Sequence, residues 1–223
     1  MKQTVAVFDF DGTLSNGECG PRFFRFFLGK KRYHLMAVLN TFWILLYLAK
    51  LGDEYAMNKV LTSVFKGKKY NELLEIAHTF SKEVMPHYIY DNIMQRLYWH
   101  QKQNHRCIIV TRSLELYMKP WGEHVAINDI IATKLEVTEN GLFTGKIANH
   151  SYVGEKKLNA LRALIGSEQN YITYAYGDSS TGDKYILAAA DYAYWIRDPK
   201  EPIDKSLLDP KTHQQWKKEC NMY

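Results

Sequence analysis

Cysteine is scarce in this chain of 223 residues, and metal-ligand spacing is absent. The three cysteines, Cys19, Cys107 and Cys220, lie far apart and form no CxxC pattern. This argues against a disulfide framework or a zinc site and favours a reducing compartment. The eight histidines are scattered without ligand spacing, so the chemistry must come from other residue types.

A dense basic stripe, an internal repeat and a low-complexity segment are also missing. The net charge of +5 is a mild excess that suits phosphate-bearing substrates or anionic membrane surfaces, and we expect no nucleic-acid partner. The N-terminus does not resemble a signal peptide, because Asp9 and Asp11 interrupt its apolar run. We therefore expect a cytoplasmic protein, with membrane association left open. Nothing in the sequence indicates the oligomeric state.

The stretch from Val5 to Leu14 carries the clearest pattern. A short apolar run, Val5 to Phe8, predicts a buried strand of a parallel sheet. It ends in Asp9 and Asp11, which alternation along an extended chain places on the same side. Two carboxylates held so close need a cation between them or a shared proton. Taken alone, the pattern also fits a strand that ends in an ordinary Asp-Gly turn.

The sequence Asp9-Phe10-Asp11-Gly12-Thr13-Leu14 resembles the first motif of the haloacid dehalogenase-like phosphohydrolases. The resemblance implies that Asp9 attacks phosphorus and forms an aspartyl-phosphate. It implies that Asp11 protonates the leaving oxygen and later activates water. It further implies a Mg²⁺ cofactor held by Asp9, the backbone carbonyl of Asp11 and acidic residues further along the chain, with Gly12 in the phosphate-binding loop. This agrees with the preference of Mg²⁺ for carboxylate oxygens.

Two later segments resemble the second and third motifs of that family. Thr111 closes the apolar run 106–111, and the resemblance implies that its hydroxyl binds a phosphate oxygen. Residues 152–158 resemble the Gly-Glu-x-Lys form of the phosphoserine-phosphatase-like branch. The spacing makes Lys157 the match and leaves Lys156 as the alternative; a cation here would balance the charge on the phosphoryl group. Read alone, a strand-ending threonine and a surface lysine pair are both ordinary.

The segment Gly177–Asp183 resembles the fourth motif, Gly-Asp-x-x-x-Asp, but carries one extra residue before the second aspartate. The resemblance implies that Asp178 binds the metal directly. Either the loop absorbs the extra residue and Asp183 also supports the metal, or Asp183 points elsewhere. Because the four motifs occur in the family's order, the resemblance covers roughly residues 4 to 197.

The order of strand and helix patterns predicts an α/β fold with a Rossmann-like parallel sheet, whose active site lies at the carboxyl ends of the strands. The sequence Asn140-Gly141 between two short apolar runs predicts a hairpin. The polar tail from Asp198 is expected to wrap the surface. Strands are predicted over 5–8, 106–111, 129–133, 135–138, 142–147, 171–176 and 191–196. Helices are predicted over 21–27, 53–64, 70–85, 89–103, 114–121, 154–164 and 183–190.

Residues 16–85 are expected to form an all-helical cap domain, inserted into a core that comprises residues 1–15 and 86–223. The most apolar run of the chain, Leu35 to Leu51, lies in this insertion, directly after Lys30-Lys31-Arg32. We favour a buried cap helix for the run. A membrane-contacting helix beside the basic cluster is the alternative. A membrane span is least favoured, since about 17 residues is the lower limit for crossing a bilayer.

The predicted substrate is a small phosphorylated metabolite. Phosphoserine phosphatases commonly carry serine where Gly12 stands and an arginine on the cap, whereas residues 57–67 hold Lys59 and Lys66 but no arginine. This argues against phosphoserine. Arg112 would either meet a substrate headgroup or pair with a surface acid. The alternatives are a lipid-phosphate phosphatase of the phosphatidylglycerophosphate type at a membrane surface, and a non-catalytic module that binds a phosphorylated ligand.

Overall fold

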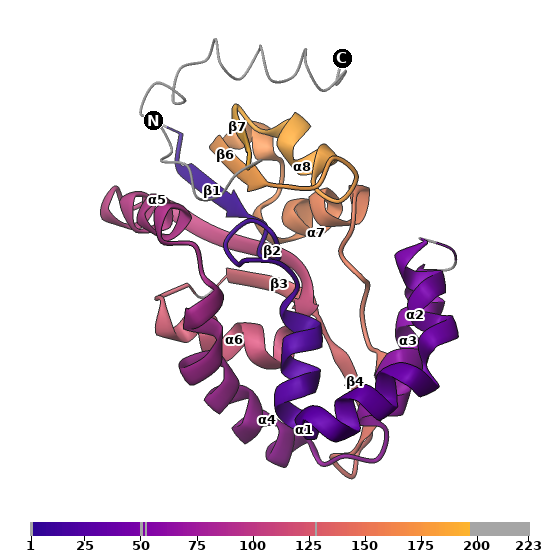
Figure 1. Ribbon diagram of the computed structural model, residues 1–223. Helices are drawn as coiled ribbons and strands as arrows, with labels where there is room; N and C mark the ends of the chain where they lie inside the picture. The colour runs from indigo at the N-terminus through magenta and orange to yellow at the C-terminus, as the bar shows by residue number, and fades with distance from the viewer. Residues whose placement is uncertain (1, 50, 52, 128, 197–223) are drawn as a thin grey trace.

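A five-stranded parallel sheet forms the centre of the computed structural model, which describes residues 2–49, 51, 53–127 and 129–196 (Figure 1). The strand order is β3-β2-β1-β6-β7. These strands are β1 (Thr4–Phe8), β2 (Arg106–Leu114), β3 (Asp129–Thr133), β6 (Ile172–Gly177) and β7 (Tyr192–Trp195). The predicted parallel α/β fold is therefore confirmed. The tail from Asp198, for which a surface path was expected, lies outside the described residues.

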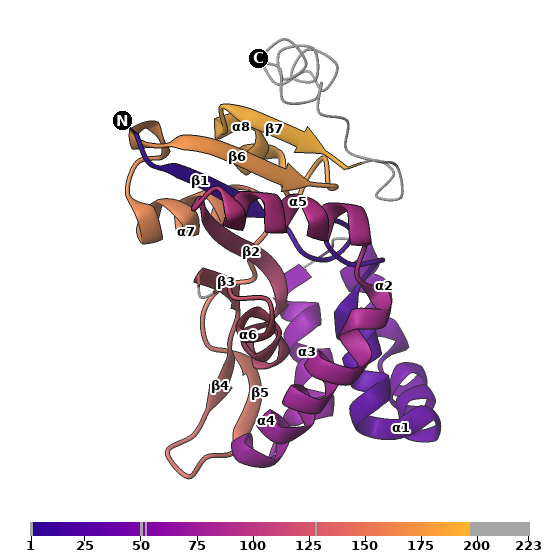
Figure 2. The same ribbon diagram turned by 90° about the vertical axis from the view of Figure 1, so that its left-hand side faces the viewer.

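Helices cover both faces of the sheet (Figures 1 and 2). Helix α5 (Asp91–Lys102) lies on one face, and α7 (Glu155–Ile165) and α8 (Lys184–Ala189) lie on the other, with the short 3₁₀ turn η3 (Glu168–Asn170) before β6. Alternation along β1 explains this layering. Val5 and Val7 pack with α7 and α8, whereas Ala6 and Phe8 pack with α5. Burial on both faces is what a continuous apolar strand requires.

Between β1 and β2 the residues that the structure describes form helices and helical turns joined by loops, and α5 is the last of these helices. Six elements precede it. The elements are α1 (Cys19–Leu39), α2 (Thr41–Leu48), α3 (Asp53–Phe65), α4 (Tyr70–Thr79), the π-helical turn η1 (Phe80–Val84) and the 3₁₀ turn η2 (Met85–Tyr88). Gly29, with φ of 74°, interrupts α1 at the predicted end of the first helix. The predicted third helix is α-helical only to Thr79. The chain then continues as the wider π-helical turn η1 and the tighter 3₁₀ turn η2, which contains Pro86, a residue that an α-helix interior does not accommodate.

The hairpin of β4 (Leu135–Val137) and β5 (Phe143–Ile147) packs against α3. The Thr62 hydroxyl donates to the carbonyl of Gly145 at 3.1 Å. A Cβ on Gly145, whose φ is 83°, would lie 2.4 Å from Cα of Thr62, so only glycine permits this approach. The hairpin was assigned to the core from the sequence, yet it contacts a helix of the segment 16–85. The division of the chain into core and cap stays a prediction.

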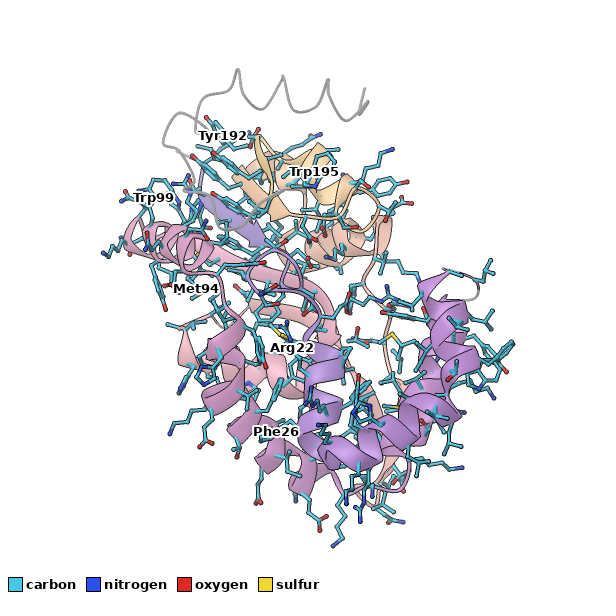
Figure 3. The ribbon with its side chains drawn as sticks, in the orientation of Figure 1. Arg22, Phe26, Met94, Trp99, Tyr192 and Trp195 are labelled. Atoms are coloured by element: carbon cyan, nitrogen blue, oxygen red, sulfur yellow. The ribbon has the colours of Figure 1, made fainter. Side chains whose placement is uncertain are left out.

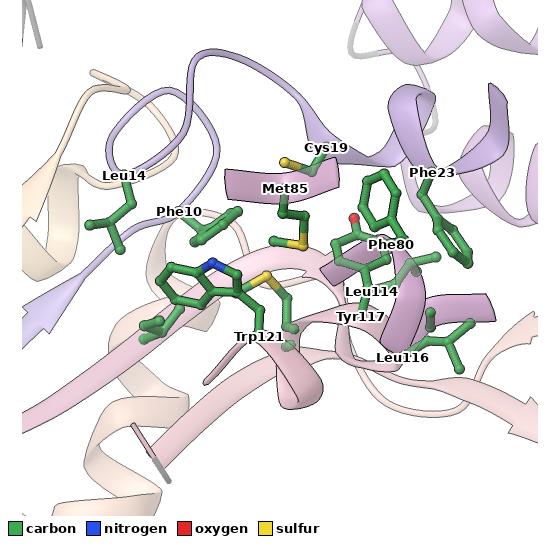
Figure 4. Packing of buried hydrophobic residues seen from close by; sticks show 14 of the residues in the cluster. Phe10, Leu14, Cys19, Phe23, Phe80, Met85, Leu114, Leu116, Tyr117 and Trp121 are labelled. Atoms are coloured by element: carbon green, nitrogen blue, oxygen red, sulfur yellow. The ribbon is translucent and has the colours of Figure 1, made fainter. Parts of the chain in front are cut away.

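Aromatic packing ties the helical segment to the sheet (Figure 4). Phe10, just after β1, meets Trp121 of α6 (Glu115–His124) edge-on with ring centroids 4.8 Å apart. The ring centroid of Phe23 on α1 lies 5.2 Å from that of Phe80, which it meets edge-on, and 5.2 Å from that of Tyr117, which it meets at a tilt. Such edge-to-face pairs add to the stabilisation from burial itself. The loop after β1 is thereby packed against α6, and α1 is packed against η1 and the same helix α6.

The apolar run from Leu35 to Leu51 is not a single buried helix. It is interrupted at Asn40, and α2 contains no buried residue. Met36 is buried, but Leu39 is 74% exposed. The preference for a buried cap helix is therefore wrong for the outward side of the run. In the part of the chain that the structure describes, no helix is both long and apolar enough to cross a bilayer.

Candidate active site

Two adjacent strands, β1 and β6, bring the predicted acidic residues to the carboxyl-terminal edge of the sheet, and β2 on the other side of β1 brings Thr111 there. Phe8, the last residue of β1, pairs with Ile109 of β2 and with Tyr176 of β6. Asp9 follows β1 directly, and its N–H donates to the carbonyl of Tyr176 at 2.9 Å. Asp178 follows β6. The candidate residues thus meet at the carboxyl ends of neighbouring parallel strands, where ligands bind in open α/β sheets.

Three carboxylates form a cluster at this edge. Oxygens of Asp9, Asp178 and Asp183 all lie within 4.8 Å of one another. Burial, and next the charge of Asp183, raise the pKa of Asp9 well above its usual value, and the same two causes raise the pKa of Asp178. Like charges packed this closely favour a bound cation. Carboxylate oxygens are also the donors that hard divalent cations prefer, so the residues present fit such an ion.

Lys157, in the first turn of α7, supplies a positive charge to the cluster. Its ammonium donates to Asp9 and, at 2.6 Å, to Oδ1 of Asp183, and the side chain is 4% exposed. Burial opposes the charged form, but Asp9 and Asp183 outweigh it and raise the pKa of Lys157, which therefore stays protonated. Lys156 instead points to Glu54 on α3, at 3.0 Å. Of the two lysines considered from the sequence, Lys157 is the one in the cluster.

The loop after β6 absorbs the extra residue of the fourth motif. The Ser179 hydroxyl accepts from the N–H of Gly182 at 2.8 Å, and the Ser179 carbonyl accepts from the N–H of Asp183 at 3.0 Å. Oδ2 of Asp183 in turn accepts from the N–H of Ser179 at 3.0 Å. A Cβ on Gly177 would lie 2.7 Å from that of Asp183, so glycine makes room for the acid. Asp183 consequently points into the cluster.

Gly12 makes room for Asp178. Its φ is +88°, and a Cβ there would lie 2.3 Å from a carboxylate oxygen of Asp178. The N–H of Gly12 donates to Ser15, so its predicted role in phosphate binding stays a prediction. Two further groups fix Asp178. The Thr13 hydroxyl donates to Oδ1 at 3.1 Å, and the indole of Trp195, a residue labelled in Figure 3, donates to the backbone carbonyl of Asp178 at 2.7 Å. Sequence reasoning singled out neither.

Asp11 lies outside the cluster and is held by its own partners. Oδ2 accepts from the Ser113 hydroxyl at 2.5 Å, and Oδ1 accepts from the N–H of Cys19 at 2.9 Å. Because the Ser113 proton goes to Asp11, the Tyr117 hydroxyl donates to Ser113, at 2.9 Å. Burial raises the pKa of Asp11, and these hydrogen bonds partly offset it. Ser113 was not identified as a site residue from the sequence, although it lies two residues past Thr111 on the same side of a strand. No pattern in the sequence indicated that Tyr117 belongs to the site.

Thr111 and Arg112 occupy the same end of β2. Thr111 is fully buried, and its oxygen accepts from the N–H of Ser113 at 3.1 Å, so the hydroxyl proton can serve another acceptor. The strand continues three residues beyond its predicted end at Thr111, to Leu114. Arg112 lines a cavity together with Asp11, and its guanidinium lies 4.4 Å from the centre of the Tyr47 ring. Arg112 therefore meets the helical segment, on the side of the site away from the sheet.

A buried hydrogen-bond chain supports β6 behind the cluster. Nε of Arg96 donates to the Tyr176 hydroxyl at 2.8 Å, and that hydroxyl lies 2.9 Å from Nε2 of His100. The hydroxyl consequently donates to His100, whose Nδ1 lies 2.8 Å from Nδ1 of His105. Burial, with the charge of Arg96, lowers the pKa of His100 to about 3. The neutral histidine thus fixes Tyr176, two residues before Asp178.

Comparisons with known proteins agree with this arrangement. A family model described as haloacid dehalogenase-like hydrolase matches residues 6–186. The inhibition of morphological differentiation protein of Streptomyces azureus is 27% identical over 187 residues, which cover 81% of this chain and 67% of that protein. A protein of unknown function from Bordetella pertussis Tohama I has a similar structure, with a TM-score of 0.74 at 20% identity, over 86% of this chain and 89% of that one. Phosphoserine phosphatase in its apo form gives 0.57 at 14% identity, over 86% and 85%. At such identities the solved structures show a shared fold.

Proposed function

The chain belongs to the haloacid dehalogenase-like hydrolase family and is thus an enzyme, and we propose that it is a Mg²⁺-dependent phosphomonoesterase acting through an aspartyl-phosphate. The observation that carries the proposal is the group of Asp9, Asp183 and Lys157, all buried, and the half-buried Asp178 at the carboxyl ends of β1 and β6. It joins a carboxylate nucleophile, a cation for phosphoryl oxygens and oxygen ligands for a metal in one place. An intact pair, Asp9 and Asp11, speaks against a non-catalytic module.

In the first step, an oxygen of Asp9 forms a bond to phosphorus while the bond from phosphorus to the ester oxygen breaks. Asp11 gives its proton to the departing oxygen, and its hydrogen bonds to Ser113 and Cys19 keep the carboxyl oriented for this transfer. Lys157 and the Thr111 hydroxyl hold the phosphoryl oxygens. The products of this step are the free alcohol and a phosphoryl group on Asp9.

In the second step, Asp11 takes a proton from water, whose oxygen attacks phosphorus and releases inorganic phosphate and the Asp9 carboxylate. When bound by Asp9, the carbonyl of Asp11 and Asp178, with Asp183 in support, Mg²⁺ would offset the negative charge that gathers on the phosphoryl group. The helices between residues 16 and 85 would act as a cap that excludes water while the intermediate forms. A cytoplasmic location stays a prediction.

The test is hydrolysis of p-nitrophenyl phosphate with Mg²⁺ by the wild type, by Asp9→Asn and by Asp91→Asn, which changes an exposed aspartate at the start of α5. We expect Asp9→Asn to be inactive and Asp91→Asn to match the wild type. Chelation with EDTA should abolish activity, and Mg²⁺ should restore it. Activity in Asp9→Asn near that of the wild type would refute the assignment of Asp9 as the nucleophile. A wild type inactive on phosphate esters would favour a module that only binds.

A further inference from the structure

A cavity of about 250 Å³ adjoins Asp11 and extends into the helical segment. The end beside Asp11 is polar and is lined by Asp11, Glu18, Arg112 and Ser113. The remaining walls come mainly from α1, α2 and α3 and are almost entirely aliphatic or aromatic, including Phe24, Tyr33, Met36, Ile44, Met57 and Val60. Such walls offer little to the amino, carboxyl or hydroxyl groups of a small polar metabolite, which would lose their hydrogen bonds to water on entry. They suit an apolar chain.

The outer surface over this cavity is also apolar. Six side chains at helical spacing on α1 and α2 are between 59% and 74% exposed; we call them the apolar face, and they are Leu35, Val38, Leu39, Phe42, Leu45 and Leu48. Large contiguous apolar surfaces usually bind a partner. Figure 1 shows α2 on the side of the molecule away from the sheet. Leu48 belongs to the apolar face and also lines the cavity, so the cavity reaches the surface here.

The charges beside the apolar face indicate which partner it fits. Lys30, Lys31 and Arg32 are consecutive and exposed, just before the apolar face on α1. Basic residues next to exposed apolar helices are typical of segments that lie in the interface of an anionic membrane. A protein partner seated over Leu48 would close the cavity, whereas a lipid surface would supply a substrate through it.

Resting on the proposed phosphatase function, we propose that the substrate is a lipid phosphomonoester drawn from an anionic membrane surface. The phosphate lies at the Asp9 and Asp11 end, and the apolar chain fills the cavity towards Leu48. The apolar face enters the interfacial region of the bilayer, while Lys30, Lys31 and Arg32 contact anionic headgroups. The reaction is unchanged: the phosphorus–oxygen bond is hydrolysed, and the lipid alcohol returns to the membrane.

The first test is a series of n-alkyl phosphates from butyl to decyl, below their micelle concentrations, with p-nitrophenyl phosphate and O-phosphoserine as references. We expect kcat/KM to rise by up to roughly fourfold per methylene until the cavity is full. In Ala37→Phe, which adds bulk to the cavity wall, the rise should stop at a shorter chain. Activity on p-nitrophenyl phosphate without any dependence on chain length would overturn the lipid substrate but not the phosphatase. Inactivity on every ester would overturn the phosphatase itself.

The second test is co-sedimentation with vesicles of phosphatidylcholine, alone or mixed with phosphatidylglycerol. The wild type should bind the mixed vesicles at least tenfold more tightly. The double change Leu39→Gln with Phe42→Gln should abolish binding, whereas Leu164→Gln, at an exposed leucine of α7, should not. Equal binding by the Leu39/Phe42 variant and the wild type would overturn docking. Docking would also be overturned if the wild type does not bind vesicles and forms a dimer that the Leu39/Phe42 variant dissociates. In that case a second copy of the chain would cover the apolar face.

The electrostatic part has its own comparison. Lys30→Gln with Lys31→Gln should weaken binding to the mixed vesicles and reduce its sensitivity to salt. Lys102→Gln, at an exposed lysine of α5, should leave both unchanged. Identical salt dependence in the wild type and the Lys30/Lys31 variant would show that the basic cluster does not contact the headgroups and would overturn this orientation.

Discussion

Replacing His100 by glutamine isolates the buried hydrogen-bond chain behind the acidic cluster. His100 is fully buried; its Nε2 accepts from the Tyr176 hydroxyl, and its Nδ1 lies 2.8 Å from Nδ1 of His105. Burial, assisted by Arg96 and His105, lowers the pKa of His100 from 6.5 to about 3. Glutamine keeps a polar side chain at the position but has no group that titrates in this range.

The sign of the effect follows from proton binding. In the unfolded chain His100 takes up a proton as the pH falls below 6.5, whereas in the folded protein it stays neutral until the pH approaches about 3. The unfolded state therefore binds more protons in this interval, and the free energy of unfolding decreases with falling pH. From pH 7 to pH 5 this one group removes about 2 kcal/mol. Any folded pKa below about 4 gives nearly the same figure, since the change is set by the unfolded state.

The measurement is urea unfolding of the wild type and His100→Gln at pH 7 and pH 5. The difference in unfolding free energy between them should shrink by about 2 kcal/mol at the lower pH. His124→Gln, at an exposed histidine of α6, should follow the wild type at both values. Wild type and His100→Gln curves that fall in parallel between pH 7 and pH 5 would refute the assignment of a neutral, buried His100.

Further predictions concern the site itself. In a Mg²⁺ titration, Asp178→Asn should raise the Mg²⁺ concentration for half-maximal activity by about 10- to 100-fold, and Asp183→Asn should raise it less. The reverse order would make Asp183 the direct metal ligand and Asp178 the supporting residue. Lys157→Met should lower kcat by about 10²- to 10³-fold. Lys156→Met, which breaks a partly exposed ion pair, should change the free energy of unfolding by less than about 1 kcal/mol. An equal loss of kcat in Lys156→Met and Lys157→Met would contradict the placement of Lys157 alone in the acidic cluster. Ser113→Ala should lower kcat at least about tenfold, since Asp11 loses a charge-assisted hydrogen bond; an unaltered kcat would remove Ser113 from the site.

Local patterns predicted most of the elements. The strand expected at 129–133 is β3 as observed, and the helix expected at 154–164 is α7 within one residue at each end. Apolar runs of strand length and glycine at helix ends carry this information in a few neighbouring residues. The meeting of Asp9 with Asp178 was also predictable, because parallel strands present their carboxyl ends at one edge.

Features that depend on distant partners were not predictable in the same way. Hydrophobicity alone cannot tell whether Leu39 and Phe42 face a core or the surface, since nothing in the sequence states which helices cover them. The contact of Tyr176 with Arg96 and His100 joins segments about 80 residues apart. The place of Asp183 depended on how the Ser179 hydroxyl folds the loop, which residue spacing leaves open.

Locating the phosphoryl group during turnover tests the central claim most directly. The enzyme is quenched in acid while it hydrolyses p-nitrophenyl phosphate with Mg²⁺, and its peptides are analysed by mass spectrometry. Asp11→Asn is run in parallel, because loss of the group that activates water should make the intermediate accumulate. We expect a phosphoryl group on Asp9 in both proteins, with a larger fraction in Asp11→Asn, because p-nitrophenolate is a weak base that can leave phosphorus without the proton of Asp11. A phosphoryl group on another residue, or full turnover by an Asp9→Asn enzyme, would contradict this expectation.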